Sequence, residues 1–207
     1  MQCYTLTFSA YLPHLLRRLP PEICLHPSQN AFLPGHHSLD HAFTLYTLVL
    51  ASRAARKPLY AVFLDELRAA YDSVSHPLLL QQLRALGLTQ PEVDLVGKLY
   101  GSASARVSTA AGASDLFSMR HGLLQGDPCS PVLFNYHLDD LARAVASADT
   151  NAPTLRRLLI PLLLHAVDIG LLSHSPEGAQ RALDVAYAAL VRLGHTIQPP
   201  KCRPCVL

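Results

Sequence analysis

The chain has 207 residues, of which half are hydrophobic and only 15% are charged. A sequence of this length and composition can bury a sizeable core, which excludes a disordered chain and suits one domain or a compact domain with a smaller lobe. The formal net charge of +2 is weaker than the charge of most dedicated nucleic-acid-binding domains. Five irregularly spaced cysteines predict no disulfide framework.

The apolar segments do not predict a membrane protein. The longest, residues 158–172, is interrupted by Pro161, His165 and Asp168 and is shorter than the ~20 residues of a membrane-spanning helix. The N-terminus lacks the basic stretch and apolar core of a secretory signal. We therefore expect an intracellular, reducing location and no membrane partner.

In the first half of the chain, the sequence predicts helices around one apolar strand. Prolines break up residues 1–37. Ser38 then has the character of an N-cap, and apolar residues follow at helical spacing. An apolar run of strand length occupies residues 59–64. The predicted helices span residues 38–56, 75–86 and 89–100.

In the second half, strands and helices alternate without a β-α-β rhythm. Residues 105–109 and 116–120 can pair as a hairpin, and a loop rich in Gly and Pro follows at residues 122–131. That loop leads into a helix with Ser130 as N-cap, ending near Ala146. The remaining predicted elements are strands at 158–164 and 169–172, flanking a tight turn, and a helix at 175–194. The pattern favours an α+β fold with helices packed on one sheet.

Acidic residues lie at the ends of two of these strands. Asp65 and Glu66 follow the strand at residues 59–64, and Asp168 precedes the strand at residues 169–172. A carboxylate there is costly unless it is solvated, paired or bound to a cation. Two such carboxylates favour a site for two Mg²⁺ ions, because Mg²⁺ prefers oxygen ligands. The alternative is that Asp ends the strands simply because it favours turns.

Five segments carry recognisable motifs: Gln29–Asp40, Phe63–His76, Arg120–Asn135, Leu164–Asp168 and Gly194–Lys201. The most specific is Gln-Gly-Asp-Pro-Cys-Ser-Pro at residues 125–131. In this order and spacing the five resemble the fingers and palm motifs of reverse transcriptases from non-LTR (LINE-type) retrotransposons. The resemblance covers nearly the whole chain, from about residue 27 to residue 203.

The resemblance implies a right-hand polymerase palm, a small antiparallel sheet backed by helices, with part of the fingers. Residues 1–58 would form a partial fingers segment, and residues 59–207 the palm with the intervening fingers helices. No thumb is recognised after Lys201, so we expect further polyprotein domains beyond this chain. The expected partners are an RNA template, a DNA primer and deoxynucleoside triphosphates.

In such a site Asp65 and Asp168 would be the catalytic metal ligands, for two Mg²⁺ ions. Counting back from the following motif without a gap places Glu66 at the first ligand position, so Glu66 is the alternative to Asp65, which we favour. The family's turn carries two adjacent acids, whereas this chain has Val167 at the first of them. Val has no oxygen to offer a cation, so we expect impaired activity.

Four further residues match nucleotide-binding or template-binding positions. Tyr71 would be the plate under the incoming sugar, although it can equally be a half-buried core aromatic. Gln125 and Gly126 would position the template base and let the backbone approach the nascent pair, or simply form a tight loop. Lys201 would contact the triphosphate, and its alternative is a solvated charge.

The implied function is RNA-directed DNA synthesis, weakened by Val167. The rival function is a non-enzymatic nucleic-acid-binding module on the same fold, which Val167 favours. Residues 202–205, Cys-Arg-Pro-Cys, have the spacing of half a zinc site. We do not predict zinc, because no second pair of ligands is evident.

Overall fold

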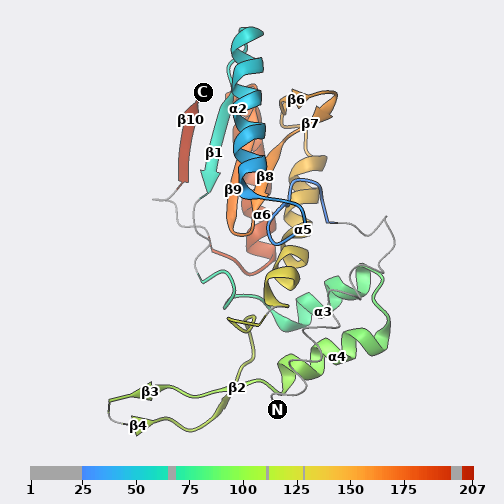
Figure 1. Ribbon diagram of the computed structural model, residues 1–207, viewed down its shortest axis with the longest axis vertical. Helices are drawn as coiled ribbons and strands as arrows, with labels where there is room; N and C mark the ends of the chain where they lie inside the picture. Colours follow the sequence, from blue (N-terminus) through green and yellow to red (C-terminus); the bar gives the residue numbers. More distant parts are fainter. Residues whose placement is uncertain (1–24, 65–68, 111, 128, 197–201) are drawn as a thin grey trace. The chain divides into compact units, whose positions relative to one another are not determined.

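The computed structural model of the chain describes residues 25–64, 69–110, 112–127, 129–196 and 202–207 (Figure 1). They divide into two compact units. The described parts of residues 25–70 and 138–207 form one, here called the sheet unit. The described part of residues 71–137 forms the other, the helical unit.

A four-stranded antiparallel sheet forms the centre of the sheet unit, with the strand order β10-β1-β9-β8. Its strands are β1 (Tyr60–Leu64), β8 (Leu162–His165), β9 (Asp168–Ser173) and β10 (Cys202–Val206). The predicted strands at 59–64 and 169–172, and the turn before the second, are confirmed. The sequence did not predict β10, because Pro204 breaks its pattern. Pro is tolerated in β10 because that strand lies at the edge of the sheet.

The predicted strand over residues 158–164 is wrong in its first half. A separate hairpin forms there from β6 (Thr154–Leu155) and β7 (Leu158–Leu159). The Ile160 N–H then donates to the Pro153 carbonyl over 2.8 Å, away from the sheet. Pro161 has no N–H to donate to a ladder, and β8 begins only after it.

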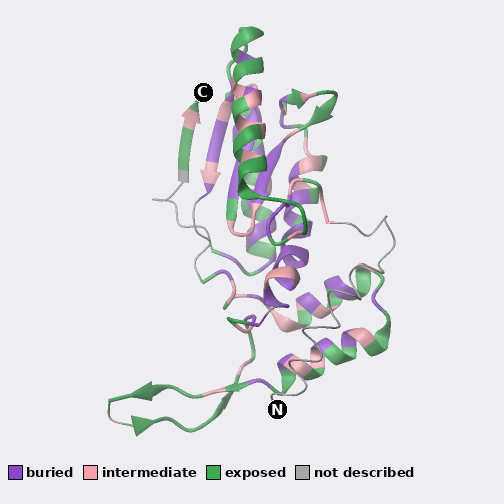
Figure 2. Cartoon of the chain, viewed as in Figure 1, coloured by how far each residue is buried: buried purple, intermediate pink, exposed green. Residues whose placement is uncertain are grey.

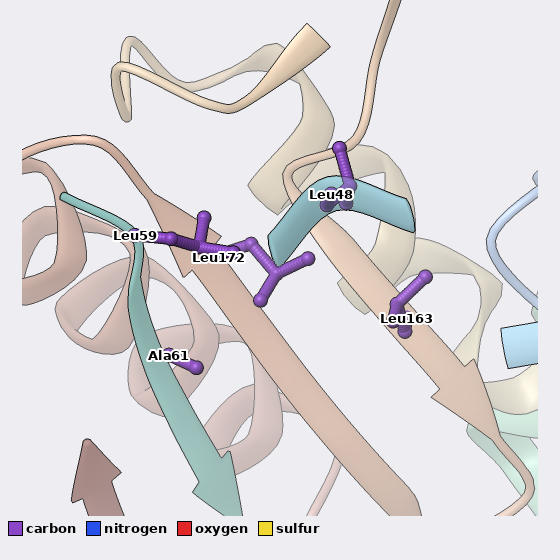
Figure 3. Close-up of a cluster of buried hydrophobic side chains, with 5 residues drawn as sticks. All are labelled: Leu48, Leu59, Ala61, Leu163 and Leu172. Carbon is purple, nitrogen blue, oxygen red and sulfur yellow. The ribbon is translucent and has the colours of Figure 1, made fainter. Parts of the chain in front are cut away.

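Helices cover the sheet. Helix α2 (Ser38–Ala54) packs through Leu48 on a cluster that contains Leu59, Leu163 and Leu172 (Figure 3). Helix α6 (Pro176–Arg192) packs against β9 and β1. The predicted cap of α6 is confirmed, because the Ser175 hydroxyl accepts from the Gly178 N–H over 3.1 Å. In contrast, the predicted N-cap Ser38 is the first residue of α2, and His37 takes the cap position.

Helix α2 has exposed residues along its length (Figure 2), and several of them are large and apolar. They recur at helical spacing, and they are Leu39, Phe43, Tyr46 and Leu50. In the part of the chain that the structure describes, no helix has the length and apolar character needed to cross a membrane.

The helical unit contains the other predicted helices, α3 (His76–Ala85) and α4 (Gln90–Gly101), which pack together. The predicted hairpin forms as two short ladders, but the inner one uses residues 112–113, which precede the predicted strand at 116–120. They pair β2 (Ser104–Ala105) with β5 (Phe117–Ser118), and β3 (Ser108–Thr109) with β4 (Gly112–Ala113). Helix α5 (Ser130–Ser147) begins here, with Ser130 as its first residue rather than its cap. Its residues after His137 belong to the sheet unit.

Candidate active site

The turn between β8 and β9 carries the described acid of the site. His165 and Asp168 are paired across the two strands, so Ala166 and Val167 form a two-residue turn. Ala166 has a φ of +55°, a left-handed conformation that residues with a Cβ adopt at a cost. Asp168 is exposed, whereas Val167 is half-buried. The carboxylate of Asp168 is therefore accessible to a ligand.

The end of β1 lies beside this turn. Leu64, its last residue, is paired with Ile169, the neighbour of Asp168. Asp65 and Glu66 follow Leu64 in the chain but lie outside the described residues, as does Lys201. Among the described residues, no three His, Cys, Asp or Glu side chains gather closely enough to hold a metal ion. The choice between Asp65 and Glu66 as first ligand stays a prediction.

Asp168 opens onto a cavity of about 440 Å³ between α2 and the sheet. The cavity floor is apolar, and Leu45, Phe63 and Leu163 contribute to it. Polar groups also line it: Asp168, His41, His165 and Arg203. An apolar floor with a few polar groups at its edge is common among ligand-binding cavities.

Residues 28–30 lie against the same turn. The sequence did not predict this contact, although residues 29 and 30 belong to one of the five motifs. Gln29 forms a parallel bridge with Leu164. The side chain of Asn30 is hydrogen-bonded to that of His165, with 2.8 Å between Oδ1 and Nδ1. The motif that resembles a fingers segment therefore contacts the turn that carries Asp168.

Tyr71 lies in the helical unit, and its ring stacks on Phe134 of α5. The two ring centroids are 4.7 Å apart and the ring planes differ by 10°. Phe134 is fully buried and Tyr71 half-buried, and this burial raises the pKa of Tyr71. The stack fixes one face of the Tyr71 ring, as both the sugar-plate and the core-aromatic interpretations require.

The loop at residues 122–131 is held against the segment that follows Tyr71. The Gly122 N–H donates to the Val74 carbonyl over 2.8 Å, and the Leu123 N–H to the Tyr71 carbonyl over 2.9 Å. His76 Nε2 donates to the Gly122 carbonyl over 2.7 Å. Within this anchored loop, Gln125 and Gly126 form an exposed turn. Both are therefore accessible, as template-positioning residues would have to be.

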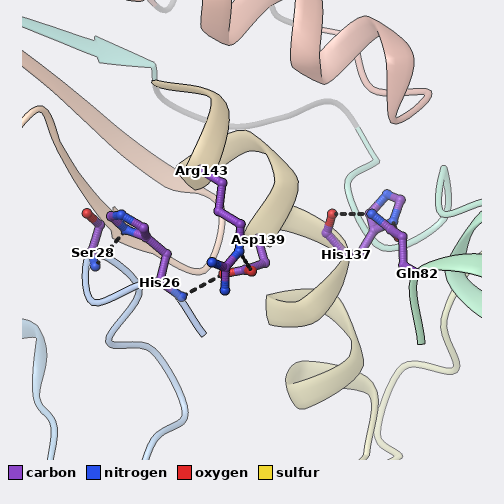
Figure 4. A network of polar contacts seen from close by, with 6 residues as sticks. All are labelled: His26, Ser28, Gln82, His137, Asp139 and Arg143. Atoms are coloured by element: carbon purple, nitrogen blue, oxygen red, sulfur yellow. Dashed lines mark hydrogen bonds and ion pairs between the residues drawn. The ribbon is translucent and has the colours of Figure 1, made fainter. Parts of the chain in front are cut away.

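Two polar networks support helix α5, one in each unit (Figure 4). In the sheet unit, the buried Asp139 carboxylate accepts from the His26 N–H over 2.6 Å and pairs with Arg143. Burial lowers the pKa of His26, against the opposing effect of Asp139. In the helical unit, Gln82 Oε1 lies 2.8 Å from His137 Nδ1. Since these contacts join residues within one unit in each network and anchor α5, we interpret both networks as structural.

The sequence model of the family "Reverse transcriptase (RNA-dependent DNA polymerase)" matches residues 8–206. The chain belongs to this family. Two relatives narrow the identification to the reverse transcriptase domain of a non-LTR retrotransposon. They are Pol polyproteins of R2 retrotransposable elements: type 1 from Popillia japonica and type 2, R2DM, from Drosophila melanogaster.

The Popillia japonica protein is 31% identical over 159 residues, which is 76% of this chain and 22% of that protein. The Drosophila melanogaster protein is 32% identical over 197 residues, or 91% of this chain and 18% of that protein. The chain therefore spans about a fifth of the length of these relatives. The predicted family is confirmed.

Solved telomerase structures from Candida tropicalis share the fold. An apo form truncated from its C-terminal domain matches with a TM-score of 0.73 at 15% identity, over 100% of this chain and 41% of that one. A complex with a fragment of telomeric RNA gives a TM-score of 0.69 at 12% identity, over 100% and 34%. The predicted α+β fold with a reverse transcriptase palm and fingers is thereby confirmed.

Proposed function

We propose that this chain is the fingers-and-palm part of an enzyme that copies RNA into DNA by nucleotidyl transfer to a primer 3′-hydroxyl. The observation that carries the proposal is the turn between β8 and β9. It presents Asp168 as an exposed carboxylate beside the end of β1, after which Asp65 and Glu66 follow. The proposed partners are an RNA template, a DNA primer and deoxynucleoside triphosphates, in a longer polyprotein.

Reverse transcriptases generally use divalent metals, and Asp168 fits such an ion because its oxygens are accessible and hard. Together with Asp65, or with Glu66 as its substitute, Asp168 would hold Mg²⁺. Bound Mg²⁺ supplies activation of the primer hydroxyl and neutralisation of the triphosphate charge. Among the described residues, Asp168 is the acid of this turn. The residue before it, Val167, has a hydrocarbon side chain and cannot coordinate a metal ion.

Val167 therefore impairs the proposed activity. A carboxylate that coordinates the ions of a two-metal site contributes several kcal/mol to transition-state stabilisation, so its loss lowers the rate by roughly 10³-fold or more. The neighbouring His165 occupies a position that is aromatic in the family. It keeps a planar ring, so we assign it no comparable loss.

We propose Tyr71, Gln125, Gly126 and Lys201 as the residues that contact the nucleotide or the template. Tyr71 would support the sugar and exclude a 2′-hydroxyl, because its ring is held by Phe134. Gln125 and Gly126 would face the template base and the nascent pair. A side chain on Gly126 would point into open space, since no other atom lies within 4 Å of its Cβ position. Lys201 would contact the triphosphate.

The second candidate function is nucleic-acid binding without catalysis, and Val167 is the observation that favours it. Primer extension separates the two functions. In Mg²⁺, the Val167→Asp variant should extend a DNA primer on an RNA template, and adding Asp168→Asn should abolish extension while leaving binding intact. Binding of the RNA–DNA duplex by either protein should weaken steeply with salt, because phosphate contacts dominate. Salt-dependent binding without extension in any variant would support the second function.

A further inference from the structure

Two buried amides lie against the turn that carries Asp168. Gln29 and Asn30 are only 2% and 3% exposed. Their segment joins the start of the turn through two backbone hydrogen bonds. The Leu164 N–H donates to the Ser28 carbonyl over 2.9 Å, and the Asn30 N–H donates to the Leu164 carbonyl over 3.2 Å. The two side chains are therefore fixed next to residues 165 and 166.

The Gln29 side chain holds the backbone of the turn. Its Oε1 accepts from the Ala31 N–H over 3.1 Å and from the Ala166 N–H over 3.2 Å. Ala166 is the residue with a φ of +55°, a conformation that persists only where surrounding contacts hold it. Gln29 supplies such a contact directly at the strained residue.

The Asn30 side chain holds the side chain of His165, the residue at the start of the turn. Its Nδ2 donates to the His37 carbonyl over 2.9 Å, which orients the amide so that Oδ1 faces His165 Nδ1 at 2.8 Å. An amide oxygen can only accept, so the proton of this hydrogen bond belongs to His165 Nδ1. Neutral His165 is thereby held as the Nδ1–H tautomer.

A third side chain ties the same segments together. His41 Nε2 lies 2.9 Å from the Ser28 carbonyl and 3.1 Å from the Leu164 carbonyl. Both partners are acceptors, so Nε2 carries the proton and donates to them. His41 and His165 both line the cavity onto which Asp168 opens.

We propose that Gln29 and Asn30 are positioning residues that fix the geometry of the turn and so of the Asp168 carboxylate. The proposal rests on the proposed function in one respect, that Asp168 is a metal ligand. Groups that orient a ligand from behind typically contribute 10–100-fold to metal affinity or activity. Gln29 and Asn30 act on Asp168 indirectly. They hold the neighbouring Ala166 and His165 by hydrogen bonds and so position the turn that carries Asp168.

The native chain already offers a test. Nitrogen NMR should find the Nδ1–H tautomer at His165, and hydrogen exchange should find the Ala166 amide protected although it lies in a two-residue hairpin turn. A dominant Nε2–H tautomer together with an unprotected Ala166 amide would overturn the proposal, with no variant needed.

Variants then test the link to Asp168, with Mn²⁺ alone as the probe. Mn²⁺ is added stepwise to the Val167→Asp protein, and the paramagnetic broadening of the Ile169 and Gly170 amide signals gives its apparent affinity. Gln29→Met and Asn30→Ala should each weaken the apparent affinity about tenfold. Asn30→Ala should also lower the fraction of neutral His165 in the Nδ1–H form. Gln82→Met is the matched control, because it removes an equivalent buried amide–histidine contact in the helical unit, and it should change neither readout.

Unchanged Mn²⁺ affinity and tautomer in folded Gln29 and Asn30 variants would refute the positioning role. Absence of Mn²⁺ broadening near Ile169 in the Val167→Asp protein itself would instead refute the proposed metal site. In that case the tautomer and the Ala166 exchange rate would still decide whether Gln29 and Asn30 hold the turn. The two failures are therefore distinguishable.

Discussion

Gly122 and Gly126 form a natural pair for testing how the loop at residues 122–131 is anchored. Their φ angles are similar, +92° and +86°, in the region that favours glycine. Their surroundings differ. A Cβ on Gly122 would lie 3.1 Å from the Asp72 Cα and 3.2 Å from the Asp72 carbonyl oxygen, whereas a Cβ on Gly126 would meet nothing within 4 Å. Substitution by Ala therefore imposes the same backbone cost at both positions and a steric cost at only one.

The left-handed conformation costs an Ala residue ~1–2 kcal/mol, which is the whole effect expected for Gly126→Ala. Gly122→Ala adds the close approach to Asp72. That backbone cannot easily retreat, because hydrogen bonds hold Gly122 to Val74 and Leu123 to Tyr71. Overpacking of this kind costs a further ~1–3 kcal/mol.

Urea unfolding followed by far-ultraviolet circular dichroism measures both free energies of unfolding. The difference between the two variants isolates the steric cost. If Gly122→Ala costs no more than Gly126→Ala, the loop does not approach Asp72 as described, and the anchoring of the loop has to be abandoned.

Three further predictions follow from particular side chains. Phe134→Leu removes the stack under Tyr71 and should lower the free energy of unfolding by ~1–3 kcal/mol. In the Val167→Asp protein it should also raise ribonucleotide relative to deoxyribonucleotide incorporation, and an unchanged ratio would argue against Tyr71 as the sugar plate. Burial lowers the pKa of His195 to about 4. The unfolded chain therefore takes up this proton first, so stability should fall by up to ~3 kcal/mol as the pH drops from about 6.5 towards 4. His195→Gln should flatten this part of the profile, and an equal slope in both proteins would contradict the assignment. Asp168→Asn changes an exposed side chain and should alter the free energy of unfolding by less than ~0.5 kcal/mol, so a larger loss would indicate a structural role.

Much of the fold could be predicted because its signals are local. Ser175 and Thr89 are N-cap residues at the starts of α6 and α4, each followed by a proline in the first turn, and both helices formed where expected. The apolar run of β1 and the short turn before β9 are likewise readable from neighbouring residues. The motif resemblance then identified Asp168 and Val167 in that turn.

The parts that the sequence did not predict depend on contacts between distant residues. β10 forms by pairing with the edge of β1, for example through Cys205 and Ala61. Gln29 contacts Ala166 across 137 positions of the sequence. Neither Gln29 nor its neighbours show a local pattern that would reveal such a partner. Tyr71 was predicted as either a substrate contact or a core aromatic, and its stack on Phe134 is compatible with both.

We propose that this chain carries a polymerase turn from which one acid is missing. The measurement that tests it most directly is the single-turnover rate of Mg²⁺-dependent primer extension on an RNA template. It compares the native chain with Val167→Asp and with the neutral, similarly shaped Val167→Asn. We predict extension by Val167→Asp at a rate roughly 10³-fold or more above the other two. Equal rates in all three proteins would contradict the account, because position 167 would then contribute no ligand to the reaction.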